Sequence, residues 1–325
     1  MKSFFGALII LALWSPLTSA ARDHKEHRPP TRIHEAINRQ PLNLEPPTSK
    51  LRLKASVSIK IRGKYREIIS NGVPQHLVGQ FPNCGNPHQI KEQSFGFTIP
   101  LEPLKMDYTT QLEPGMAFGV AINGVPFEPY AAEWWKGRRN SEWRYEALSG
   151  AVALGADANH AHVQPGGKYH YHGLPTGLMN KHDVSKERHS KLIGWAADGF
   201  PIYSLYGFVN KKDKSAGIRE FQSSFQLKAG ERPGGIFNPG GEYDGAFNAD
   251  YEYKENLGDL DRCNGVNTIT PEFPDGTYAY FLTSNWPFVP RCFSGIPDPS
   301  FNLKATSNIR GKKPKKPNGC PKPKR

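Results

Sequence analysis

Two His-x-His pairs flank a short turn in the middle of the 325-residue chain, and this stretch restricts the local fold more than any other. His160 and His162 precede the turn, and His170 and His172 follow it. Side chains two positions apart on a β-strand point to the same face. The sequence Pro-Gly-Gly at 165–167 is typical of a β-hairpin turn. The sequence therefore predicts a hairpin with two histidines on each strand.

The length of the turn decides whether the two histidine pairs share one face of the hairpin. A three-residue loop at 165–167 pairs His162 with His170 and His160 with His172, with opposed Cβ atoms about 5 Å apart. A two-residue turn would place the pairs on opposite faces, and a β-bulge could also change the parity. Glycine favours the three-residue loop, so we expect all four imidazoles on one face.

Four imidazoles on one face predict a metal site. Neutral imidazole binds zinc, copper, iron and nickel, whereas clustered protonated rings repel one another. We expect copper first and zinc second as the ion held by His160, His162, His170 and His172. The alternative is a hairpin whose histidines are merely hydrogen-bonded. Four neighbouring residues are expected to orient the ligands or to serve the site chemically: Asp157, Asp198, Tyr169 and Tyr171. Asp198 precedes a glycine, so it is also a candidate turn former.

The first twenty residues are typical of a secretory signal peptide. Lys2 provides a positive start, residues 7–14 form an apolar core, and small residues ending at Ala20 form a cleavage site. The apolar run is too short to span a bilayer, and no later stretch is long and apolar enough to do so. We therefore expect a secreted or periplasmic protein with no transmembrane segment after cleavage.

Both ends of the mature chain have the composition of disordered segments. Residues 21–50 are polar and proline-rich and predict a disordered linker. Residues 304–325 predict a basic, disordered tail, and eight cationic side chains occur at 310–325 in a chain whose net charge is +12. The tail either contacts anionic cell-surface polymers or only aids solubility. Nucleic acid is not expected as a partner, because the exported chain has no recognised binding motif.

Four cysteines in an exported chain predict disulfide bonds. Cys263 and Cys292 flank a compact segment and are the favoured pair. Cys84 and Cys320 could form a second bond, but Cys320 could also be free or pair with another molecule. The chain has no Cys-x-x-Cys motif, so neither a thioredoxin-type site nor a cysteine-rich zinc site is indicated.

Glycine, proline and aromatic residues are frequent, which favours many short strands and loops. Residues 51–62 alternate between apolar and polar side chains, which predicts a half-buried strand. We expect a mainly β fold at 51–303, as a single large antiparallel domain that is sandwich- or barrel-like, with long loops. A few short helices are expected at 131–135, 143–148 and 176–180.

The string Tyr-His-Tyr-His-Gly at 169–173 resembles the signature of the YHYH-domain family of exported, mostly bacterial proteins. Further blocks resemble the same family, at residues 119–127, 157–165, 196–203, 258–265, 276–278 and 290–292. The resemblance covers about residues 55–300. It implies a single β-rich domain with the histidine motif at a metal site, and it implies no settled activity.

Three functions are consistent with these features. The leading hypothesis is an exported metal-binding protein that captures, delivers or senses the ion. The second is a metal-dependent enzyme, either a hydrolase with Asp157 or Asp198 as base or an oxidoreductase that cycles copper or iron. The third is a cell-surface or glycan-binding module that uses the tryptophans and the basic tail. The sequence has neither a nucleophile elbow nor a His-Glu-x-x-His motif.

Overall fold

The computed structural model describes residues 33–303 and 317–320, which belong to one compact unit. The expected signal peptide at 1–20 and most of the expected tail lie outside the described residues. Strands dominate the described part, so the prediction of a mainly β fold with few short helices is confirmed. Within that part, no helix has the length and apolarity that crossing a membrane requires.

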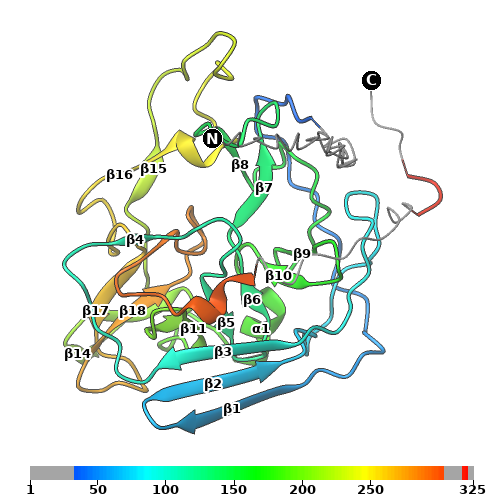
Figure 1. Cartoon of the computed structure of the whole chain (residues 1–325). Helices are drawn as coiled ribbons and strands as arrows, with labels where there is room; N and C mark the ends of the chain where they lie inside the picture. Colours follow the sequence, from blue (N-terminus) through cyan, green and yellow to red (C-terminus); the bar gives the residue numbers. More distant parts are fainter. Residues whose placement is uncertain (1–32, 304–316, 321–325) are drawn as a thin grey trace, which may run out of the picture. The chain divides into compact units, whose positions relative to one another are not determined.

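The largest element is an eight-stranded sheet with the order β17-β18-β12-β11-β5-β6-β10-β9 (Figure 1). Its strands are β5 (Gly119–Ala121), β6 (Pro126–Phe127), β9 (Ala161–Val163), β10 (Tyr169–Tyr171), β11 (Leu192–Ala196), β12 (Pro201–Tyr203), β17 (Gly265–Thr268) and β18 (Thr277–Phe281). Most neighbours are antiparallel, but β10 runs parallel to β6 and β12 runs parallel to β18. The histidine-bearing strands β9 and β10 lie at one end of this sheet.

A second sheet contains β1 (Val57–Arg62), β2 (Tyr65–Ser70) and β3 (Phe95–Pro100), which lie side by side in that order (Figure 1). On β3 the side chains of Phe95, Phe97 and Ile99 are buried, while Gly96 is exposed. The ring centroid of Phe97 lies 4.7 Å from that of Phe301. This alternation is the period of two that a half-buried strand requires.

The remaining elements are short and lie around the two larger sheets. Four two-stranded pairs are β4 (Thr110–Gln111) with β19 (Cys292–Phe293), β7 (Tyr130–Trp134) with β8 (Arg144–Glu146), β13 (Tyr206–Asn210) with β14 (Asp213–Glu220), and β15 (Phe225–Leu227) with β16 (Tyr251–Tyr253). The helices are α1 (Thr176–Lys181), η1 (Asn248–Asp250) and η2 (Pro299–Phe301). The expected helix at 176–180 is therefore present as α1.

The other two expected helices, at 131–135 and 143–148, are strands in the structure. They form β7 and β8, in which Tyr130 pairs with Glu146 and Trp134 pairs with Arg144. The Arg144 guanidinium lies over the rings of Tyr130 and Trp134, at 4.2 and 4.5 Å from their centroids. Aromatic side chains favour a pleated surface, and here the cross-strand stacking outweighs the helical tendency of the alanines.

The second half of the expected linker is bound to the compact unit. Within residues 33–50, the Glu45 amide donates to the Ala156 carbonyl at 2.9 Å. The Ser49 amide likewise donates to the Val78 carbonyl at 2.9 Å. Composition alone suggests a solvated segment. However, its backbone groups form hydrogen bonds with neighbouring loops, and these bonds fix the segment against the compact unit.

Two disulfide bonds link distant segments. The expected bond between Cys263 and Cys292 is formed, and both residues lie in the main hydrophobic core. The bond that the sequence left open, between Cys84 and Cys320, is also formed. It attaches residues 317–320 to the loop that precedes β3.

Candidate metal centre

Strands β9 and β10 form the hairpin that the sequence predicts, with a three-residue loop. Tyr169 pairs with Val163, and His170 pairs with His162. The loop is closed by hydrogen bonds from the Gln164 amide to the Lys168 carbonyl and from the Gly167 amide to the Gln164 carbonyl, each 2.9 Å long. Gly166 and Gly167 have φ angles of 99° and 92°, which side-chain-bearing residues rarely adopt.

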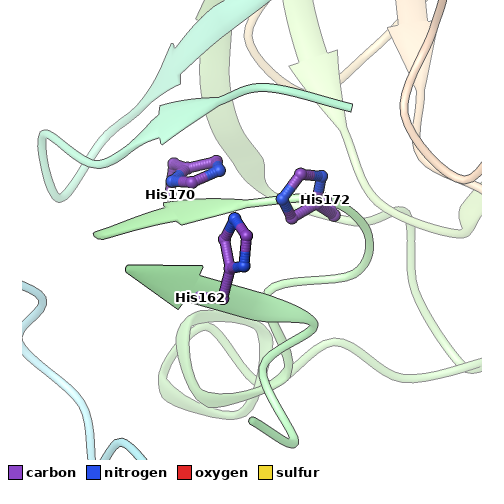
Figure 2. A group of neighbouring side chains, drawn as sticks. All are labelled: His162, His170 and His172. Atoms are coloured by element: carbon purple, nitrogen blue, oxygen red, sulfur yellow. The ribbon is translucent and has the colours of Figure 1, made fainter. Parts of the chain in front are cut away.

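The imidazoles of His162, His170 and His172 are turned toward one another (Figure 2). His162 lies on β9, His170 lies on β10, and His172 directly follows β10. We call these three residues the histidine triad. Their ring centroids are 4.7 Å apart in every pair. One nitrogen from each ring lies within 4.8 Å of the others, so the triad could hold a metal ion. Bonds of about 2 Å to a shared ion would draw these nitrogens closer together.

Backbone carbonyls orient two of the rings. His162 Nδ1 lies 3.2 Å from the Leu154 carbonyl, and His170 Nδ1 lies 3.4 Å from the Lys168 carbonyl. A carbonyl only accepts, so Nδ1 is the protonated nitrogen in each ring and Nε2 carries the free lone pair. Metal-bound histidines commonly donate their second ring nitrogen in this way.

Several ring nitrogens of the triad are buried without a hydrogen bond of ordinary geometry. They are His170 Nε2 and both ring nitrogens of His172, although the Pro129 carbonyl lies near the latter ring. His170 and His172 are 0% and 1% exposed. A buried polar atom without a hydrogen-bond partner lowers the free energy of unfolding by about 1–3 kcal/mol. An ion bound by these nitrogens would remove this cost.

The triad is held in the neutral, metal-binding protonation state. Burial lowers the pKa of His162 to about 4 and lowers the pKa values of His170 and His172 well below their usual range. Neighbouring positive charge acts in the same direction, including Lys168 beside His162 and His170. Neutral imidazole is the form that binds a metal, so no proton has to be displaced at neutral pH.

The fourth histidine of the motif lies outside the triad, which differs from the expectation of four converging rings. The His172 amide donates to the His160 carbonyl at 2.7 Å, so the hairpin pairing extends to His160. However, His160 has a φ angle of 51°, outside the extended region, and its Nδ1 donates to the Leu174 carbonyl at 2.9 Å. The alternation of side chains therefore ends before this residue.

The two tyrosines of the motif lie on the opposite face of β10. The Tyr169 hydroxyl donates to the Asp157 carboxylate at 2.8 Å. The Tyr171 hydroxyl lies 2.6 Å from His76 Nε2 and accepts from Asn123 Nδ2 at 2.9 Å. The structure thus places Tyr169, Tyr171 and Asp157 in a hydrogen-bond network behind the triad, and the partners of the two tyrosine hydroxyls are Asp157, His76 and Asn123 rather than triad histidines.

Asp198 also lies away from the triad. Its Oδ2 accepts hydrogen bonds from the Tyr280 hydroxyl at 2.6 Å and from the Gly295 amide at 2.9 Å. Burial raises the pKa of the Asp198 carboxyl to about 6, against these hydrogen bonds, which lower it. These bonds anchor the turn between β11 and β12 to Tyr280 on β18 and to Gly295, which follows β19.

A buried ion pair that the sequence analysis did not identify shares the triad's face of the hairpin. Lys168 Nζ lies 2.5 Å from Glu128 Oε1, and both side chains are 8% exposed. Gln164 Nε2 donates to Glu128 Oε2 at 3.2 Å. Lys168 and Gln164 are two positions from His170 and His162, so the period of two could have identified them. Glu128 follows β6, and local sequence contains no signal for its position here.

Comparison with known proteins identifies a family but no characterised relative. The sequence model of the family described as YHYH protein matches residues 96–295 of the 325. This region includes the hairpin, the whole triad and the Cys263–Cys292 bond. No curated protein and no solved structure matches the chain.

Proposed function

The chain belongs to the YHYH protein family, and from this premise we propose that it is an exported protein that binds one transition-metal ion through His162, His170 and His172. The convergence of three neutral imidazoles, of which His170 and His172 are fully buried, carries the proposal. Two of them belong to the residue string that spells the family's name. The two disulfides support export, because such bonds persist in oxidising compartments.

We propose copper as the first candidate ion and zinc as the second, since all-imidazole sites suit both. The three ligands are neutral, and the charged neighbours that depress triad pKa values include the cations Lys168 and Arg291. Each of these cations has a buried carboxylate partner, so no spare negative charge is evident there. A monovalent ion adds less uncompensated charge to a buried site than a divalent one, which favours copper(I).

The function proposed for the protein is to capture, deliver or sense this ion outside the cytoplasm. The test is metal content of the full-length chain, prepared without affinity-tag histidines and equilibrated separately with copper(I) and zinc. We expect about one ion per chain, and a large loss in His170→Ala and His172→Ala. Circular dichroism and thermal melting show whether each variant is folded.

His160→Ala is the matched control, because His160 lies in the same hairpin but its ring bonds to the Leu174 carbonyl. It should keep the bound ion. If folded His170→Ala binds as much metal as the parent, the proposal is wrong. Equal losses in His160→Ala and His170→Ala would contradict the assignment of the ligands.

A metal-dependent hydrolase is the second candidate, for one specific reason. Among the described residues, the candidate ligand group contains three histidines, and three-histidine zinc sites keep a fourth position for water. Glu128, rather than Asp157 or Asp198, would then be the base, because it lies beside Lys168 on the triad's face. Zinc-loaded protein that hydrolyses 4-nitrophenyl acetate, with activity lost in Glu128→Gln but zinc retained, would favour this function.

A further inference from the structure

A cavity of about 590 Å³ lies on the side of β10 to which Tyr171 points, behind the histidine triad. Its walls come from four separate parts of the chain: residues 47–55, residues 74–77, Asn159 and helix α1. Its volume falls within the range of about 300–1,000 Å³ that is usual for small-molecule sites. None of the functions considered above uses this cavity.

One wall is an apolar stripe. Leu51, Leu53 and Ala55 line the cavity and are half-buried, while the intervening Arg52 and Lys54 are exposed. Burial alternates only up to Val57, where β1 begins, and residues 58–62 of β1 are exposed. The half-buried strand expected at 51–62 is therefore formed only from Val57, and residues 51–55 line the cavity instead. Leu77 adds a further apolar side chain, and it remains 49% exposed. An alkyl chain lying here would remove apolar surface from water on both sides.

The charged side chains of the cavity are all cationic. Lys50 and Lys181 line it, and no aspartate or glutamate does. Lys181 Nζ donates to the Gln75 carbonyl at 2.5 Å, which holds its ammonium group at the cavity wall without neutralising it. A ligand with an anionic group would meet two positive charges and no acidic group among the lining residues.

The polar wall is fixed and uncharged. His76 Nδ1 donates to the Leu77 carbonyl at 2.8 Å, so its Nε2 accepts from the Tyr171 hydroxyl at 2.6 Å. Burial lowers the pKa of His76, in keeping with a neutral ring. Asn159 Nδ2 donates to the Leu77 carbonyl at 3.0 Å. The bond from Tyr171 joins the cavity wall to β10, and together these bonds hold the wall in place.

We propose that this cavity binds a small amphipathic carboxylate, with its alkyl chain against Leu51, Leu53 and Leu77 and its carboxylate directed to Lys50 and Lys181. The proposal is independent of the metal site, because the cavity lies on the other face of β10. The apolar stripe selects the body of the ligand, and the two lysines select its charge.

The test is isothermal titration of the full-length chain with decanoate, decan-1-ol and acetate. We expect saturable binding of decanoate, weaker binding of decan-1-ol because it has no charge, and no measurable binding of acetate because it has no chain. The variant Lys50→Gln/Lys181→Gln should bind decanoate about tenfold more weakly and bind decan-1-ol unchanged. Lys54→Gln is the matched control and should match the parent, because Lys54 points away from the cavity.

A blocking variant tests the position of the site. Ala55→Trp should fill the cavity and abolish binding of both long-chain probes, while metal content and the circular dichroism spectrum stay as in the parent. The proposal is overturned if decanoate does not bind saturably, if the double lysine variant binds it as the parent does, or if folded Ala55→Trp keeps its affinity.

Discussion

At the scale of single residues, alternation along β10 divides the Tyr-His-Tyr-His string into two faces. His170 and His172 meet His162 on one face. Tyr169 and Tyr171 hydrogen-bond on the other. The tyrosines therefore hold the strand in place, and the histidines are available to the proposed ion.

This division predicts different effects for neighbouring substitutions. Tyr171→Phe leaves His76 Nε2 and Asn123 Nδ2 without their shared partner, so we expect a loss of about 1–3 kcal/mol in the free energy of unfolding. Metal content should not change. Tyr65→Phe, in which the parent residue is 47% exposed, should cost little. Urea unfolding and metal analysis measure both effects, and metal loss in Tyr171→Phe would contradict the division.

Asp198 predicts a pH dependence of stability. Burial raises its folded-state pKa from 3.8 to about 6, so between these values the folded chain binds more protons here than the unfolded chain does. The stabilisation that protonated Asp198 gives the folded state is therefore fully present below pH 4. It is lost as the pH rises through 6, which lowers the free energy of unfolding by an amount on the order of 2–3 kcal/mol. The variant Asp198→Asn cannot titrate, and its amide oxygen can accept from both Tyr280 and Gly295.

The measurement is the free energy of unfolding of parent and Asp198→Asn between pH 4 and pH 7. We expect the parent to lose stability relative to the variant across this interval. The clustered histidines are shared by both proteins and cancel in the difference. Parallel curves for the two proteins would show that the carboxyl has an ordinary pKa in the folded state.

At the scale of elements, period-two patterns and turn residues predicted those features that depend on residues close together in the sequence. The three-residue hairpin loop and the pairing of β9 with β10 follow from such signals. Residues 131–148 did not, because the pairing of β7 with β8 depends on stacking between side chains of different strands. The same holds for Glu128, which reaches the triad's face only through tertiary packing.

The positions of the four motif histidines were likewise only partly predictable from the sequence. The pairing of His162 with His170 followed from counting loop residues. His160 points away from the triad because its backbone is in the left-handed region. Neither the neighbouring residues nor strand geometry indicates this conformation. Three of the four expected ligand residues therefore lie together, and the fourth bonds to a carbonyl.

The conformation of the hairpin loop predicts that a methyl group added at Gly167 destabilises the folded state. Gly167 has a φ angle of 92°, and a Cβ atom there would lie 2.9 Å from the Lys91 backbone nitrogen. Gly167→Ala should therefore lower the free energy of unfolding by about 2 kcal/mol or more and weaken metal binding, because the loop sets the register of the triad. Thermal melting and metal titration measure the two effects.

Gly137→Ala is the control for backbone strain alone. Gly137 also has a positive φ angle, 67°, but nothing lies within 4 Å of a Cβ atom there. This variant should be less destabilised than Gly167→Ala and should bind metal as the parent does. Equal effects of the two substitutions on metal affinity would show that the loop does not control the triad.

At the scale of the whole molecule, the two disulfides differ in their exposure to solvent. Cys263 and Cys292 are 1% and 3% exposed within the main core. Cys84 is exposed and Cys320 is half-buried, and their bond closes a sequence separation of 236 residues. A thiolate reductant has to reach a sulfur atom to attack it, so burial should protect the first bond and not the second.

We therefore predict selective reduction in the folded protein. Metal-free chain treated with dithiothreitol at neutral pH and then with iodoacetamide should be labelled at Cys84 and Cys320, as peptide mass spectrometry would show. Labelling of Cys263 and Cys292 should require denaturant, because the core must open first. The hairpin should keep its triad after selective reduction, since the broken bond joins only residues 317–320 to the loop before β3. The selectively reduced protein should thus still bind its ion, whereas labelling of all four cysteines at one rate would show that the core opens as readily as the attachment of the C-terminal segment.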